Sequence, residues 1–216
     1  MIFIALSIFT VSAQEQIGFS VHVGGVFPFE MMRSLTTNHS VNETTLNGGA
    51  TFGASIGLKY TYKFQETGWE DSGNGIFVSA DLLWNEMNKK SKTFYKENDK
   101  IAPRYFHIPI LLGYNYTYEL GMSDIVSVFG QLGLGVDMFK RTKEGWPGDI
   151  TKYDMSYAFA ADVGVGLVFI DRVSIGIHFN WLGQHKIKIS GKEYSSGEYY
   201  MVENSSNIVL KAGFHF

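Results

Sequence analysis

No cysteine occurs in the 216-residue sequence, which excludes a disulfide framework and any metal site built on thiolates. Only four prolines occur and the mean hydropathy is near zero, so neither a disordered chain nor a helical membrane protein fits. The net charge of −3 is small and no basic run is present, so we expect no nucleic acid among the partners. The length fits one domain or a small pair.

What the chain has in abundance is glycine, with 24 residues, and aromatic side chains, which make up 15% of the sequence. Glycine permits tightly curved sheets, and aromatic residues form girdles around membrane barrels. The first 13 residues, MIFIALSIFTVSA, are apolar and end in small residues. This is typical of a signal peptide, although Lys and Arg are missing from it, and it is too short to span a bilayer as a helix. We expect residues 1–13 to be a signal peptide, with a buried first element as the alternative, and residues 14–216 to be the outer-membrane barrel domain.

The C-terminal segment, Ser206–Phe216, alternates between apolar and polar or small residues, with Val209 as the exception. A period of two indicates a β-strand with one apolar face. The strand ends on an aromatic residue. It resembles the C-terminal insertion signal of outer-membrane barrels, which the barrel-assembly machinery reads; the residues that carry the resemblance are Leu210, Ala212, Phe214 and Phe216.

The same alternation recurs along the chain and predicts seven more strands. The expected strands cover residues 17–27, 51–64, 76–85, 106–118, 126–138, 153–169, 173–181 and 206–216. Long loops follow the first, third, fifth and seventh strands, and short turns follow the fourth and sixth; the connection after the second is longer. The expected fold is therefore all-β, an eight-stranded antiparallel up-and-down transmembrane β-barrel.

With both chain ends in the periplasm, the aromatic residues fall at two levels, as the girdles of such a barrel do. One level is expected to hold Tyr60, Tyr62, Phe64, Tyr114, Tyr116, Tyr118, Phe169, Phe214 and Phe216. The other is expected to hold Trp84, Tyr153, Tyr157, Phe179 and Trp181.

A soluble ligand-binding barrel of the lipocalin kind is the competing interpretation. Its apolar face would point inward and its outer face would be rich in Lys and Glu. Here the polar face consists mainly of Gly, Ser, Thr and Asn, which suits the narrow interior of an eight-stranded membrane barrel. The composition of that face favours the outer membrane as the location.

Four features occur together in the sequence: the signal-like start, the segment His107-Ile108-Pro109-Ile110-Leu111-Leu112, the Gly-rich fifth and sixth strands and the final Phe. In these features the chain resembles the PorT-like outer-membrane β-barrel family of Bacteroidota. The resemblance implies a small eight-stranded outer-membrane protein. It also suggests a component of an envelope secretion or uptake assembly.

The inward polar residues are the candidates for chemistry, and paired charges are the simplest interpretation of them because buried ions need partners. They are Lys59, Lys63, Asp81, Asp137, Asp154, Asp162, Lys211, His22, His178 and His215. His22 and His178 are expected at similar depth with His215 nearer the periplasm. A three-histidine metal site needs closer heights, so we expect no metal and no cofactor.

Near the outer rim of the expected barrel, away from the periplasm, lie residue types that hydrolases use, namely Asp154, Ser156, His185, His39 and Asp149. They form no recognisable motif, so no catalytic residue is assigned and the protein is not expected to be an enzyme. Eight strands also leave no room for an open pore. We expect a structural scaffold that displays the loops 28–49 and 183–205 for surface binding. The expected partners are outer-membrane lipid, the assembly machinery and an envelope or surface protein.

Overall fold

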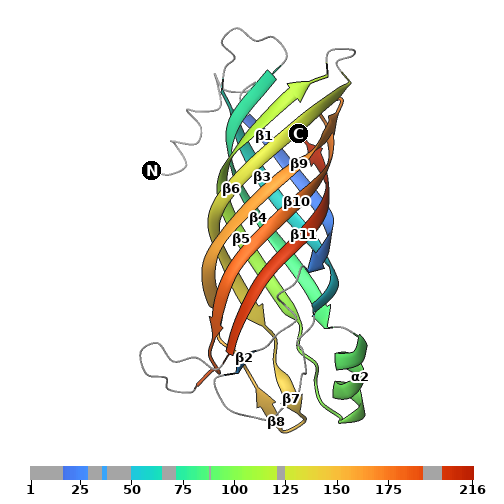
Figure 1. Ribbon diagram of the computed structural model, residues 1–216, viewed down its shortest axis with the longest axis vertical. Helices are drawn as coiled ribbons and strands as arrows, with labels where there is room; N and C mark the ends of the chain where they lie inside the picture. Colours follow the sequence, from blue (N-terminus) through green and yellow to red (C-terminus); the bar gives the residue numbers. More distant parts are fainter. Residues whose placement is uncertain are drawn as a thin grey trace.

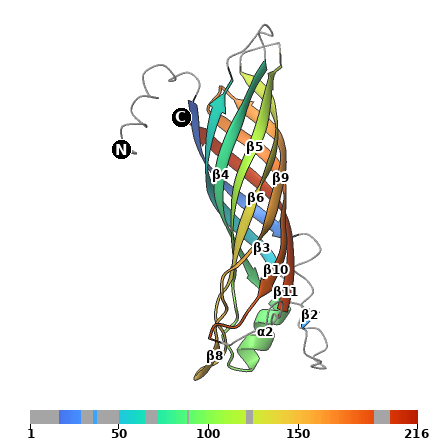
Figure 2. The same cartoon turned by 90° about the vertical axis from the view of Figure 1, so that its left-hand side faces the viewer.

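The computed structural model of the protein describes residues 17–28, 36–37, 50–64, 72–87, 89–120, 125–191 and 201–216. Eight long antiparallel strands form a closed barrel, shown from two sides in Figures 1 and 2. They are β1 (Ile17–Pro28), β3 (Ala50–Lys63), β4 (Ser72–Met87), β5 (Tyr105–Glu119), β6 (Val126–Arg141), β9 (Ser156–Phe169), β10 (Val173–Ile187) and β11 (Met201–His215). Each strand pairs with its neighbour in the sequence, and β1 pairs with β11 to close the sheet. The predicted eight-stranded up-and-down barrel is confirmed.

Smaller elements gather at one end of the barrel, opposite the end where the C-terminus lies (Figure 1). They are β2 (Thr36–Thr37), α2 (Lys89–Glu97) and the hairpin of β7 (Glu144–Trp146) and β8 (Asp149–Thr151). We call this end, with α2 and the β7–β8 hairpin, the platform, and the opposite end the terminal rim. Among the described residues, no helix is long and apolar enough to cross a membrane.

The period of two sorts the side chains of every long strand onto the two faces of the wall. On β3, Ile56, Leu58 and Tyr60 point outward and are about half exposed, whereas Ser55 and Gly57 between them are buried inside. The other strands repeat this division, so the exterior of the barrel is an apolar band and its interior holds most polar side chains. A surface of this kind is stable against lipid and costly in water.

The aromatic girdles occupy the predicted places with one exception. Tyr60, Tyr114 and Phe216 are exposed towards the terminal rim, and Trp84 and Trp181 are exposed towards the platform. Tyr153 was expected on the outer surface but is 1% exposed. This prediction was wrong because β9 starts only at Ser156, so Tyr153 lies before the alternation begins and turns inward over the end of the lumen.

Pro109 lies within β5 without ending the strand. On one side β5 pairs continuously with β6, where Pro109 lies opposite Asp137. On the other side the pairing with β4 passes from Ile110 to His107 without a partner for the residues between them. The gap agrees with the missing N–H of proline, which cannot donate to a neighbouring strand.

The connections at the platform end differ from the loops expected there. The charged segment after β4 contains the helix α2, and the segment after β6 contains the β7–β8 hairpin. Strand β10 continues to Ile187 and β11 starts at Met201, so much of the expected final loop is strand. The expected signal peptide and most of the expected first loop lie outside the described residues.

Candidate functional site

The lumen is filled by alternating polar and apolar layers. Along β10, for example, the inward residues from the middle of the strand towards the platform are His178, Asn180, Leu182, His185 and Ile187. Along β11 in the opposite direction they include Ser205, Val209 and Lys211. The same order on the neighbouring strands gives a charged central layer, an apolar layer, a histidine layer and an apolar cap under the platform.

The central layer is organised around two buried carboxylates, of which Asp81 is the first. His22 Nε2 lies 2.5 Å from Asp81 Oδ1, and Lys211 Nζ donates to Asp81 Oδ2 at 3.0 Å. Gly57 lies across from Asp81 on β3, and a Cβ atom there would collide with the carboxylate. The absence of a side chain at Gly57 thus makes room for the ion pair.

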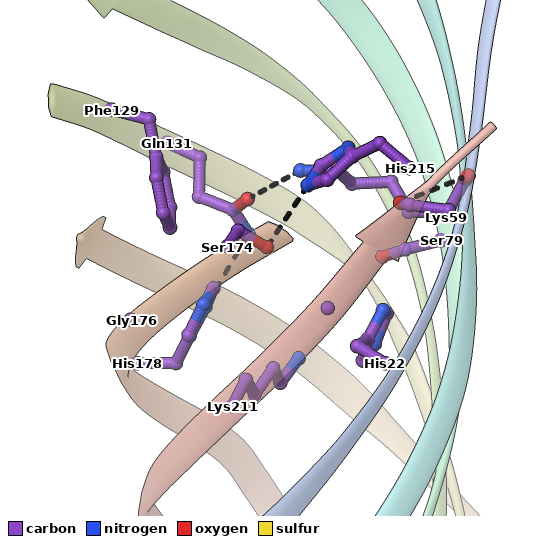
Figure 3. A pocket seen from close by; sticks show the side chains of 12 residues that line it. His22, Lys59, Ser79, Phe129, Gln131, Ser174, Gly176, His178, Lys211 and His215 are labelled. Atoms are coloured by element: carbon purple, nitrogen blue, oxygen red, sulfur yellow. Dashed lines mark hydrogen bonds between the residues drawn. The ribbon is translucent and has the colours of Figure 1, made fainter. Parts of the chain in front are cut away.

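The second carboxylate, Asp162, is linked to Lys59 through an amide. Lys59 Nζ donates to Gln131 Oε1 at 3.0 Å, and Gln131 Nε2 donates to Asp162 Oδ2 at 2.5 Å. His178 Nδ1 lies 3.2 Å from the same carboxylate. Figure 3 shows Lys59, Gln131 and His178 among the side chains around a small cavity of about 30 Å³, which is enough for one water molecule. The central layer therefore carries its own cations.

A wider recess opens at the terminal rim. Its volume is about 290 Å³, and Lys63, Asn115, Glu119 and Asp171 are among its lining residues. On the platform side of the central layer, by contrast, an apolar cluster fills the barrel; its members are Val26, Phe77, Leu83, Leu111, Ala160, Leu182 and Val209, each at most 3% exposed. This packing closes the lumen between the recess and the platform.

The histidine layer lies between that cluster and the platform. His107 Nδ1 is 2.5 Å from Asp137 Oδ2, and His185 Nε2 is 3.0 Å from the same oxygen. Ser205 Oγ lies 3.2 Å from His107 Nε2. All three charged or titratable side chains are 0% exposed. The order Ser205–His107–Asp137 has the connectivity of a hydrolase triad, but a nucleophile must be reached by its substrate, and Ser205 is 1% exposed.

A bulge in β10 brings His185 into this layer. The register with β11 shifts between Trp181 and Gln184, and Gly183 there has a φ of +70°, which favours glycine. Before the bulge the even-numbered residues of β10 point inward, and after it His185 and Ile187 do. One extra residue therefore decides which side of the wall His185 occupies.

The platform is held by an apolar cap and by a single carboxylate. The cap consists of Met87, Tyr105, Phe139, Tyr153 and Ile187. Glu144 accepts hydrogen bonds from Tyr95 at 3.0 Å and from Arg141 at 2.6 Å, and Tyr153 also donates to it. Burial, together with the nearby Glu144 carboxylate, raises the pKa of the Tyr95 phenol well above its usual value. These bonds join α2 to the strand ends, so the platform is an ordered body.

A basic groove of about 310 Å³ runs between α2 and the adjoining strand ends. Its cations are Lys92, Lys96, Lys100 and Arg104, and Lys92 forms an ion pair with Glu86. Between Glu86 and Arg104 the sequence has six basic residues against three acidic ones. Arg104 also lies over the ring of Trp84, which belongs to the outward aromatic girdle. The groove therefore begins where the apolar band ends.

The structure separates several of the residues that the sequence grouped together. His22, His178 and His215 line one cavity, but they bond to Asp81, Asp162 and Ser174 respectively. At the other end, Asp149 and Asp154 are exposed, Ser156 donates to a backbone carbonyl, and His39 lies outside the described residues. Lys63 and Asp154 were expected inside the barrel. Lys63 lines the recess at the terminal rim and is exposed there, whereas Asp154 is exposed at the platform end because it lies before the start of β9.

Sequence reasoning missed the link between His107 and Asp137. Asp137 was assigned to the inner face, and His107 lies on the neighbouring strand β5, so the neighbourhood of β5 and β6 was the available signal. The residues of the expected insertion signal, Leu210, Ala212, Phe214 and Phe216, all project outward from the end of β11. Their role in assembly stays a prediction.

A closed barrel with an apolar exterior, two aromatic girdles and a filled polar lumen is an eight-stranded transmembrane β-barrel of the outer-membrane type. The chain is similar in structure to Neisserial surface protein A (12% identity, 92% of this chain and 95% of that one, TM-score 0.48) and to OprG of Pseudomonas aeruginosa (14%, 92% and 95%, 0.48). It is also similar to Ail, the attachment invasion locus protein of Yersinia pestis (14%, 93% and 99%, 0.43). No protein-family model matches the sequence, and the comparison with curated proteins found no match. Likeness at these identities concerns the fold alone.

Proposed function

We propose that the protein is a non-enzymatic scaffold of the outer membrane, whose platform faces outward and binds anionic groups at the cell surface. The observation that carries the proposal is the ordered basic groove beside α2, lined by Lys96, Lys100 and Arg104 and held on a rigid closed barrel. Rigid scaffolds that present ordered outer elements are suited to binding.

The filled interior of the barrel favours a structural scaffold over a channel or transporter. The apolar cluster around Leu111 and Leu182 fills the lumen, and the recess that opens at the terminal rim ends before it reaches this cluster. The triad-like set at Ser205 lies within the wall of side chains, away from lipid and from water. Among the described residues, this packing supports neither transport through the lumen nor hydrolysis at Ser205.

The position of the groove favours phosphate-bearing lipid headgroups as the ligand. Arg104 stacks over Trp84 at the edge of the apolar band, where headgroups lie. Lysine and arginine are the side chains that hold phosphate, and clusters of them at a membrane surface attract anionic lipid. The groove thus carries the positive charge that binds phosphate and lies at the depth of the lipid headgroups.

The test is binding of purified lipid A to the barrel in a zwitterionic detergent. We expect the double variant Lys96→Glu/Arg104→Glu to bind lipid A at least about tenfold more weakly, because each lost charge-assisted contact is worth about 1.5–3 kcal/mol. Lipid A without its phosphates should bind the unaltered protein equally weakly. The matched control is Lys63→Glu/Arg172→Glu, which changes two exposed basic residues at the terminal rim and should leave the affinity unchanged. Equal losses in both variants would contradict the proposal.

The alternative is a component of a secretion or uptake assembly, as the PorT resemblance suggests. It predicts a stoichiometric protein partner after cross-linking in intact envelopes and pull-down, whereas the scaffold predicts lipid without such a partner. Fractionation of cells, combined with heat-modifiable gel mobility, tests the location and the removal of residues 1–13 in the same sample.

A further inference from the structure

Several buried polar side chains of the lumen, Asn180 and Asn207 among them, have atoms without a hydrogen-bond partner among the described residues, but in the histidine layer such atoms belong to a carboxylate and an imidazole. Both imidazoles meet at Asp137 Oδ2, while Asp137 Oδ1 and His185 Nδ1 are buried and lack a hydrogen-bond partner among the described residues. Buried polar atoms in proteins are nearly always paired, so two orphans in one cluster call for an explanation.

The charge of Asp137 in this layer also needs a partner. Among the described residues, the hydrogen bonds to the Asp137 carboxylate come from two imidazoles and from no lysine or arginine. The carboxylate is 0% exposed, and a buried carboxylate is costly unless a cation offsets its charge. A bound cation would offset the charge of the carboxylate, and a carboxylate that coordinates it through both oxygens would use Oδ1 as well as Oδ2.

We propose that His107, Asp137 and His185 form a site for a divalent first-row transition-metal ion such as Zn²⁺ inside the barrel. One donor atom from each residue lies within 4.8 Å of the others, and two histidines with one carboxylate are a donor set that such ions prefer. Ligands around tetrahedral zinc lie about 3.3 Å apart, given bonds of about 2.0–2.1 Å. The bonded nitrogens and oxygen, now 2.5 and 3.0 Å apart, therefore need to separate only slightly.

Ser205 supports this assignment from outside the donor set. Its Oγ lies 3.2 Å from His107 Nε2, the nitrogen that faces away from Asp137. When Nε2–H donates to this hydroxyl, the lone pair of Nδ1 is available to the metal, which is the usual arrangement of metal-bound histidines. Ser205 is thus a positioning residue, and its removal should weaken binding about 10- to 100-fold.

The layer is sealed, so metal binding is coupled to folding and is tested by refolding. The barrel without an affinity tag is unfolded in urea with a chelator, the chelator is removed, and the barrel is refolded into detergent with and without Zn²⁺. The zinc retained after desalting is measured by elemental analysis, and the folded fraction by heat-modifiable gel mobility. We expect one zinc per folded barrel for the unaltered protein.

The variants separate this site from nonspecific binding. Asp137→Asn and His185→Gln should retain no stoichiometric zinc, whereas His178→Gln, which removes an equally buried histidine of the central layer, should retain one. Anomalous scattering at the zinc edge, or X-ray absorption of the unaltered protein, gives a readout that needs no variant. Folded unaltered barrel without zinc, or Asp137→Asn with one zinc, would overturn the proposal.

Discussion

The two polar layers of the lumen balance the charge of their buried carboxylates in different ways. In the central layer each carboxylate lies in a network with a lysine, Asp81 with Lys211 and Asp162 with Lys59 through Gln131. In the histidine layer Asp137 meets two imidazoles. A lysine that is paired with a carboxylate brings a positive charge at neutral pH, whereas an imidazole acquires a charge near neutral pH only by binding a further proton. The central layer is therefore complete in itself, and the histidine layer is completed by something it takes up.

The largest expected effect comes from breaking the charge balance of the central layer. Lys211→Met leaves the Asp81 carboxylate buried beside His22 alone, and the loss of one partner of a buried pair costs about 3–5 kcal/mol. The measurement is urea unfolding of the barrel in lipid vesicles. Adding Asp81→Asn to the same chain should restore most of the lost stability, since it removes the uncompensated charge. A double variant as unstable as the single one would show that lysine contributes through packing.

A second prediction compares the response of the two layers to metal. Because zinc binds the folded barrel, it should raise the free energy of unfolding by about 2.7 kcal/mol at a concentration one hundred times its dissociation constant. Asp137→Asn should abolish this gain, and Asp162→Asn, the corresponding change in the central layer, should keep it. The same urea titration, with and without Zn²⁺, measures both. A gain that survives in Asp137→Asn contradicts the assignment of the site.

The platform offers a third test, in which the effect should stay local. Glu144→Gln weakens the hydrogen bonds from Tyr95 and Arg141, and bonds to a charged acceptor are worth about 2 kcal/mol. We expect faster hydrogen exchange in α2 with little change in the amides of β6. Equal acceleration in α2 and in the middle of the barrel would mean that the platform and the barrel unfold as one unit.

The sequence allowed the wall of the barrel to be predicted because alternation is a local property of each strand. Residues such as Leu58 and Ser55 reveal their side of the sheet through their immediate neighbours. The contents of the lumen could not be derived in this way. Which inward side chains meet depends on the register of strands far apart in sequence, and Asp81 and Lys211 are an example.

The structure at the platform end was not predicted from the sequence, for a different reason. The helix α2 has the sequence KKSKTFYKE, in which one adjacent Phe-Tyr pair is the only large apolar feature, and it is held by the contacts of Tyr95 with Glu144 and with the apolar cap. Tyr153 was placed on the wrong face because the alternation was extended three residues beyond the true start of β9. His185 was placed in a loop because a bulge interrupts the alternation of β10 just before it.

The smallest expected effect tests that bulge and, through it, the difference between the layers. Gly183→Ala places a side chain at a φ of +70° and against the backbone carbonyl of Phe159 and the Ala158 side chain, which should cost at least about 1 kcal/mol. Gly191→Ala is the matched control, because Gly191 has a φ of +80° but nothing close to its Cβ position. Both changes carry a backbone cost, yet only the first shifts His185, so zinc affinity should fall in Gly183→Ala alone while Lys211 and Asp81 keep their contribution. Unchanged affinity in both would mean that strand pairing with β11, and not this glycine, sets the direction of His185.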